Sequence, residues 1–179
     1  IASLLLLPTP FFPVHLLFMN LITDSLPAIA IGMEAGRNDV LKEKPRQAND
    51  SILNKTTFLQ ISYEGIVIAI CTMCAYLTGL KGDPLTASTM AFATICLARL
   101  LHGFNCRSHQ PLTKIGFFTN RSSIIAFIIG FGLLHFILFV PAMHGLFMIH
   151  TISFTQLFII YGFALLPTII IQARKMLTK

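Results

Sequence analysis

Long apolar stretches alternate with short polar ones along the chain, and most of the apolar stretches are long enough to form membrane-spanning helices. A helix needs about 20 mostly apolar residues to cross roughly 30 Å of hydrocarbon. Five windows meet this requirement, and glycine, proline, asparagine or charged residues separate them. The windows cover residues 14–33, 58–80, 87–106, 122–141 and 154–174. The pattern therefore predicts an all-α, polytopic transmembrane helix bundle with five full spans.

The first seven residues, IASLLLL, are equally apolar but too short to be a span. At 1.5 Å per residue they would cover about 10 Å, which is a third of a crossing. The sequence begins with isoleucine and lacks the basic region and cleavage site of a signal peptide. We therefore expect the end of a sixth helix here, in the C-terminal piece of a longer protein.

The composition excludes an ordinary soluble domain. Of the 179 residues, 55% are hydrophobic and only 11% are charged, and the mean hydropathy is +0.77. The net charge of +6 comes mainly from segments 34–57 and 107–121 and from the C-terminal tail, whereas the opposite loops contribute only Lys81. The positive-inside rule places these segments and the C-terminus in the cytoplasm. Because the basic residues lie beside spans, nucleic-acid binding is disfavoured. We expect an integral protein of a bacterial-type plasma membrane.

A polar cluster interrupts the first predicted span, in the stretch NLITDSLPAIAIGME. A charged side chain near the bilayer centre costs at least about 2.5–3.5 kcal/mol on insertion scales, so Asp24 needs a reason to be there. Asn20 and Thr23 precede it at the spacing that places all three side chains on one face of an α-helix. Their oxygen atoms suit hard cations such as calcium or magnesium, whereas zinc or copper would require histidine or cysteine.

Pro27 adds a backbone argument for a cation site. Proline has no N–H, so the carbonyl of Thr23 loses its helical partner and becomes available to a ligand. Broken helices form ion sites in transporters in this way. The alternative is a polar patch that only holds helices together by hydrogen bonds, combined with an ordinary transmembrane proline. We favour the cation site.

Other polar and small residues within the spans have less specific interpretations. Glu64 lies about two turns into its span from the cytoplasmic end, so it can either contribute to the site or reach water at the interface. The six histidines do not cluster in the sequence, and we assign them structural roles. Glycines within membrane spans are typical of close helix packing, and we expect such packing at four of them. They are Gly32, Gly65, Gly130 and Gly132.

The stretch NLITDSLPAIAIGME resembles the sixth transmembrane helix of the type II P-type ATPases, most closely of their calcium-pump branch. In that family an N-L-x-T-D-x-x-P-A pattern supplies ligands to the transported ion. The segment NDVLKEKPR resembles the loop between helices six and seven, and TMAFATICLARLLHGFNCRS resembles helix eight and its exit. The resemblance covers essentially the whole chain, from late in helix five to helix ten.

The resemblance implies that Asn20, Thr23 and Asp24 are ligands of a transported Ca²⁺, with further ligands from helices four and five. It also places Arg99 where two-site pumps have a carboxylate in helix eight. A guanidinium is always charged and has no acceptor, so it cannot ligate a cation but can pair with Asp24 or with an acid in helix five. Our hypothesis is that Arg99 replaces one calcium ion and leaves a single-site pump with proton countertransport. The alternative is an arginine that reaches towards cytoplasmic phosphates.

The resemblance further implies partners outside this sequence. Helices one to five and the actuator, phosphorylation and nucleotide-binding domains would complete the chain, and the cytoplasmic domains would use Mg²⁺ and ATP. This sequence contains no D-K-T-G phosphorylation motif, so we expect no ATP hydrolysis by this chain alone. The loop 34–57 is the expected contact of the phosphorylation domain. A secondary cation transporter or channel subunit that works without ATP remains an alternative, and the ion stays open among Ca²⁺, Mn²⁺, Mg²⁺, Na⁺ and K⁺.

Overall fold

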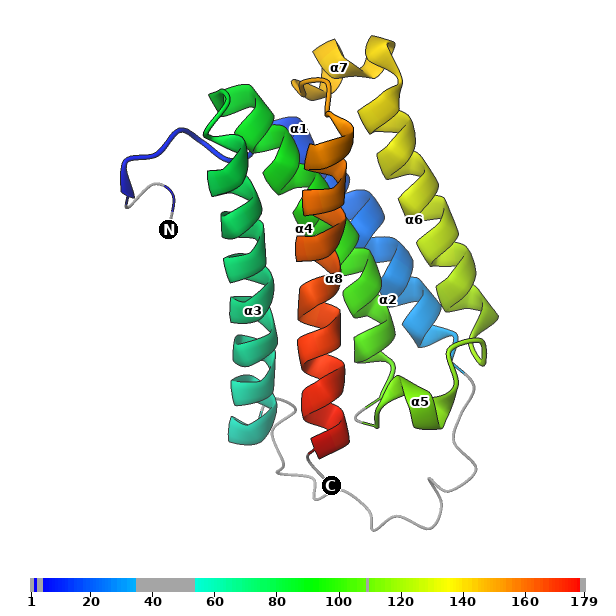
Figure 1. The fold of residues 1–179 in the computed structure, drawn as a ribbon. Coiled ribbons are helices and arrows are strands. Elements are labelled where there is room, and N and C mark those ends of the chain that lie inside the picture. The colour runs from blue at the N-terminus through cyan, green and yellow to red at the C-terminus, as the bar shows by residue number, and fades with distance from the viewer. Residues whose placement is uncertain (1, 3–4, 35–53, 109, 178–179) are drawn as a thin grey trace, which may run out of the picture.

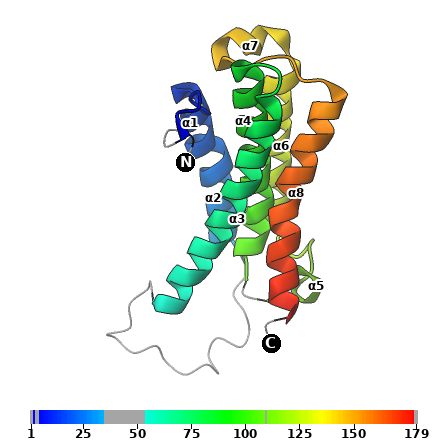
Figure 2. The same cartoon turned by 60° about the vertical axis from the view of Figure 1, so that its left-hand side comes forward.

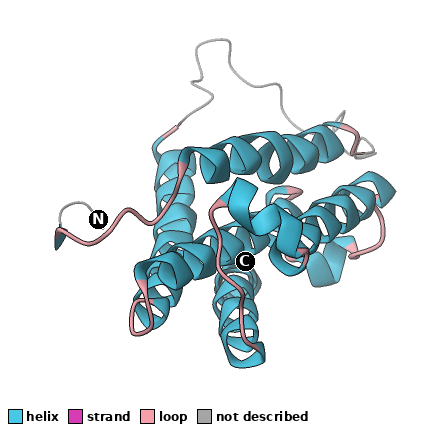
Figure 3. Cartoon of the chain, turned by 90° about the horizontal axis from the view of Figure 1, so that it is seen from above, coloured by secondary structure: helices cyan, strands magenta, loops and turns pink. Residues whose placement is uncertain are grey.

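The computed structural model describes residue 2 and residues 5–34, 54–108 and 110–177. Throughout this part of the chain the regular structure is helical, as Figures 1 and 3 show. Three segments follow one another in the first span, and four long helices and two short ones come after it. The segments are α1 (Pro13–Phe18), the π-helix η2 (Met19–Asp24), α2 (Ser25–Gly32), α3 (Lys55–Gly79), α4 (Pro84–Cys106), α5 (Leu112–Ile115), α6 (Arg121–Phe139), α7 (Pro141–Phe147) and α8 (Phe154–Leu177).

The predicted spans are confirmed. Five helical stretches in the described residues are long and apolar enough to cross a membrane. They are Pro13–Gly32, Lys55–Gly79, Pro84–Cys106, Arg121–Phe139 and Phe154–Leu177. The predicted end of a sixth helix falls on residues 1–7, of which 1, 3 and 4 lie outside the described residues. None of the others is α-helical. So short a piece gains few of the hydrogen bonds that offset the cost of starting a helix.

Helix α4 lies at the centre of the bundle (Figures 1 and 2). It packs against α3, α6, α8 and the first span, and 72% of its most apolar stretch is buried, against 22–33% for the other spans. Its first half is rich in alanine, serine and threonine, whose small side chains let neighbouring helices approach closely. A residue on α4 is therefore well placed to contact several other spans.

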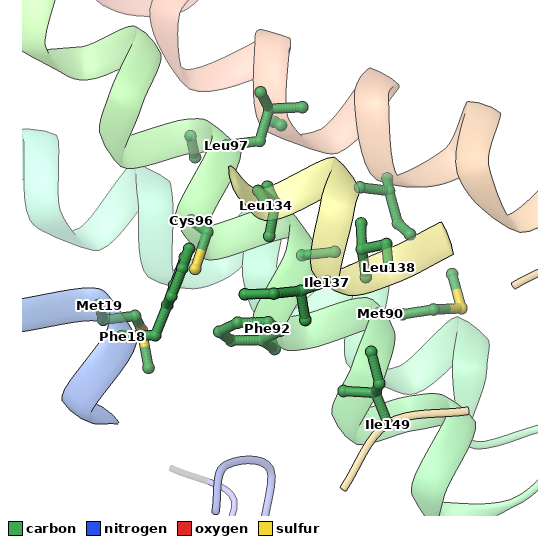
Figure 4. Close-up of a cluster of buried hydrophobic side chains, with 14 of the residues drawn as sticks. Phe18, Met19, Met90, Phe92, Cys96, Leu97, Leu134, Ile137, Leu138 and Ile149 are labelled. Carbon is green, nitrogen blue, oxygen red and sulfur yellow. The ribbon is translucent and has the colours of Figure 1, made fainter. Parts of the chain in front are cut away.

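The largest hydrophobic cluster joins the first span to α4 and α6. Phe18 and Met19 pack on Phe92 and Cys96 of α4, beside Leu134 of α6 (Figure 4). This contact fixes the first span against α4 immediately before Asp24. Tertiary packing therefore holds the predicted site next to the central helix.

The predicted close packing at glycines is confirmed at one position only. A Cβ atom added to Gly130 in α6 would lie 2.5 Å from a methyl carbon of Leu100 in α4. A Cβ atom added to Gly32, Gly65 or Gly132 would meet nothing within 4 Å in the described part of the chain, so close packing is not seen at these three positions. Gly79, which was not among the four predicted glycines, packs against the backbone of α4.

Candidate cation site

The first span departs from α geometry at the predicted site. Met19–Asp24 form a six-residue π-helix, and α2 begins at the next residue. In a π-helix each backbone bond reaches back five residues, and such turns are frequent at functional sites. The Ser25 hydroxyl follows the same spacing and donates to the Asn20 carbonyl at 2.8 Å. The predicted irregularity is therefore present, but it is a wide turn preceding Pro27 and not only a proline kink.

Only two of the three predicted ligands line a pocket. Asp24 and Thr23 line a pocket, but Asn20 is exposed and is not among the lining residues. Thr23 is 2% exposed, and its hydroxyl donates to the Met19 carbonyl at 2.9 Å. The expectation that all three side chains share one face assumed an α-helix. Asn20 does not line the pocket with the other two, so that expectation does not hold for it.

The pocket lies between α2, α3 and α4 and has a volume of about 540 Å³. Its wall is close-packed at Pro27, because a Cβ atom added to Gly103 of α4 would lie only 3.0 Å from the proline ring. Isoleucines form much of the remaining surface, so the polar side chains stand out against an apolar background. The polar lining residues are Thr23, Asp24, Glu64, Arg99 and His102.

An ion pair joins the first span to α4 within this pocket. The Arg99 Nη1 donates to Asp24 Oδ2 at 2.9 Å, although the residues are 75 positions apart in the sequence. Their side chains are 36% and 44% exposed in this chain. Opposite charges inside a membrane protein pair with one another because an isolated charge there is costly. The predicted pairing is present, and Arg99 bonds to Asp24 instead of reaching the cytoplasmic phosphates.

A second polar pair lines the same pocket. Glu64 is 7% exposed, and its carboxylate accepts from Gln60 Nε2 at 3.0 Å and lies 3.4 Å from His102 Nε2. Glu64 therefore faces α4 inside the bundle, and the interfacial alternative does not describe it. The sequence interpretation missed His102. Its position three residues after Arg99 on the same helix was the available signal, because that spacing shares a face.

The described residues supply only part of a calcium shell. No group of three or more histidine, cysteine, aspartate or glutamate side chains that could hold a metal occurs within them. Calcium takes six to eight oxygen ligands, so Asp24 and its neighbours would need ligands from outside this part of the chain. A hydroxyl that donates one bond still has acceptor lone pairs, so Thr23 can ligate while it bonds to Met19.

Spanning helices around a pocket that contains paired charges are an arrangement typical of membrane transport proteins. The family described as "Cation transporting ATPase, C-terminus" matches residues 8–177. The chain therefore belongs to this family and is an integral membrane protein, and the resemblance to the type II P-type ATPases is confirmed.

Curated relatives agree with the family match. A Bacillus cereus protein named Calcium-transporting ATPase 1 is 34% identical over 189 residues, covering 95% of this chain and 21% of the relative. A Bacillus subtilis Calcium-transporting ATPase is 32% identical over 99% of this chain and 20% of its own length. The human Calcium-transporting ATPase type 2C member 1 is 27% identical over 90% of this chain and 18% of its own length. The chain thus spans about a fifth of the length of these relatives.

Proposed function

We propose that this chain is the transmembrane ion-binding part of an ATP-driven calcium exporter. The observation that carries the proposal is the Arg99–Asp24 pair at 2.9 Å, in a pocket between three spans of a chain from this family. The relatives' names support calcium as the ion. Family membership also favours an ATP-driven pump over the secondary transporter or channel subunit.

In this proposal Asp24 is the principal ligand and Thr23 a second one. Asn20 joins them if the first span turns when the cation binds, because its side chain lies outside the pocket otherwise. Further oxygen ligands come from helices four and five of the longer chain. Glu64 is a further candidate, since its carboxylate lines the same pocket.

Arg99 acts as a tethered cation in this scheme. Its guanidinium bonds to Asp24 Oδ2, and in this proposal it takes the place of a second calcium ion that would otherwise share the carboxylate. Since a guanidinium never loses its charge or accepts a bond, it excludes a second cation in every step of the cycle. One calcium ion would then leave per cycle, and protons would return on the emptied carboxylates.

The rest of the proposed pump lies outside this chain. Phosphorylation and nucleotide-binding domains would use Mg²⁺ and ATP, and the actuator domain and helices one to five would complete it. Segment 34–57 would contact the phosphorylation domain from the cytoplasmic side of a bacterial-type plasma membrane, with the C-terminus on the same side. Residues 35–53 of this segment lie outside the described residues.

The test is the number of calcium ions transported per ATP by the full-length protein in sealed vesicles. One ion per ATP is expected for the native protein, and two would refute the single-site proposal. Arg99→Glu supplies a carboxylate in place of the guanidinium and should raise calcium binding above one ion per pump. Arg99→Ala is the matched variant that removes the charge without adding a ligand. Phosphorylation measured with Ca²⁺, Mn²⁺, Mg²⁺, Na⁺ and K⁺ in turn identifies the ion.

A further inference from the structure

A second arginine joins the first span to α4 near one end of the bundle. Arg107 Nε donates to Glu34 Oε2 at 2.8 Å, and Arg107 Nη2 donates to Glu34 Oε1 at 2.7 Å. The Arg107 side chain is fully buried, and that of Glu34 is 27% exposed. This bidentate geometry fixes both the distance and the orientation of the two groups.

The remaining donors of Arg107 tie the pair to the chain that leads into α6. Arg107 Nη2 also donates to Thr119 Oγ1 at 2.7 Å, and Nη1 donates to the carbonyls of Gly116 and Phe117 at 3.4 and 3.3 Å. The hydrogen bonds that Arg107 donates thus connect the end of α2 with the segment between α5 and α6. Figure 1 shows α5 and the end of α2 near the same end of the bundle.

Asn120 completes the network from the start of α6. Its Nδ2 donates to Glu34 Oε2 at 2.5 Å and to the Ala30 carbonyl at 3.0 Å, and its Oδ1 accepts from the Ser123 N–H at 3.0 Å. The Arg107 guanidinium, and secondarily Asn120, hold the pKa of Glu34 below its ordinary value, so its carboxylate stays charged. The end of α2 is therefore fixed by charged and neutral donors together.

Two arginine–carboxylate pairs thus connect the first span to α4. They are ten residues apart on the first span and eight apart on α4, or roughly 15 and 12 Å at 1.5 Å per residue. The Arg99–Asp24 pair has one hydrogen bond and is more than a third exposed. The Arg107–Glu34 pair is bidentate, and its arginine is buried. When a cation competes for Asp24, the first contact opens more easily than the second.

We propose that the Glu34–Arg107 pair is the pivot about which the first span moves when a cation binds at Asp24. Both residues are positioning residues, because they act on the cation only through the orientation of α2. The inference rests on the proposed function, since it assumes that Asp24 binds the transported cation. If the Glu34–Arg107 contact is weakened, α2 can tilt freely. A cation that binds at Asp24 must then also order α2, and the free energy that this costs lowers its affinity.

The experiment measures phosphorylation of the full-length protein from ATP against calcium concentration. Arg107→Lys keeps the charge but cannot form the bidentate contact, and Glu34→Gln keeps the shape without the charge. Each should raise the calcium concentration for half-maximal phosphorylation about 10-fold, within the range typical of coupling between sites, with little change in the maximal level. The charge reversal Glu34→Arg with Arg107→Glu should recover part of the loss. Arg121→Ala, at an exposed arginine at the start of α6, is the matched control and should change nothing.

Thermal unfolding of the same variants separates a pivot from a purely structural contact. If both single variants unfold at lower temperature but keep the native calcium dependence within twofold, the pivot is refuted. If one variant does not fold, the other decides, and if neither folds, a charge reversal that restores the native unfolding temperature but still needs about ten times more calcium also refutes it. A wild-type protein that is not phosphorylated in response to calcium refutes the proposed function instead, so the two failures are distinguishable.

Discussion

Replacing Gly79 with alanine should separate α3 from α4 near the turn that joins them. The added Cβ atom would lie 2.7 Å from the Ala87 Cα atom and 3.0 Å from the Met90 sulfur, whereas ordinary contacts are 3.4 Å or more. The nearest obstacle is backbone, which cannot turn aside as a side chain can. The helices must therefore move by several tenths of an ångström, and inserting a methyl group into so tight a contact costs about 1–3 kcal/mol.

Substitutions at two other glycines should be less destabilising and serve as comparisons. At Gly130 the obstacle is a methyl group of Leu100 at 2.5 Å, which can change rotamer, so Gly130→Ala should cost less than Gly79→Ala. At Gly132, on the same helix as Gly130, nothing lies within 4 Å, and Gly132→Ala should be neutral or slightly stabilising.

The assay is equilibrium unfolding of the full-length protein and its three variants in mixed micelles. The expected order of destabilisation is Gly79→Ala, then Gly130→Ala, then Gly132→Ala. A Gly79→Ala protein as stable as Gly132→Ala would refute the close approach of α3 and α4 and with it the reasoning from backbone contact.

Two further predictions concern the site and the start of α4. Asp24→Asn in the full-length protein removes the carboxylate that faces Arg99 and should abolish calcium-dependent phosphorylation at calcium concentrations that saturate the wild type; unchanged calcium dependence would contradict the role of Asp24. Asp83 accepts from the N–H groups of Leu85 and Thr86 at 2.9 Å each, so Asp83→Ala should cost about 1 kcal/mol of stability through loss of the helix cap. Hydrogen bonds from Thr86 lower the pKa of Asp83, so this stabilisation is present above the ordinary carboxyl pKa and is lost as the pH falls through the lowered value. Unfolding measured against pH should therefore show an acid-dependent decline in the wild type that is smaller in Asp83→Ala, and parallel curves would contradict it.

The spans could be predicted from the sequence alone, and the charge pair was one of the outcomes it allowed. A run of about 20 apolar residues has few alternatives to a spanning helix, so the span ends were predicted to within three residues. A pair between Asp24 and Arg99 was one of the predicted alternatives, because opposite charges are costly to leave apart among apolar spans, and the two side chains bond at 2.9 Å. The roles of Asn20, Thr23, Asp24 and Arg99 in ion binding remain predictions.

Which polar groups meet in the pocket depends on helix packing, which the sequence pattern does not specify. The hydropathy pattern does not show which side chains of a span line a pocket, so the position of Asn20 outside it could not be foreseen. The approach of His102 to Glu64 depends on how α3 and α4 are rotated about their axes. Arg107 and Glu34 are 73 residues apart, and their contact requires the ends of two spans and the start of α6 to come together. Apolar length determines that a helix spans the membrane, but the packing of side chains between helices determines which of its faces meet.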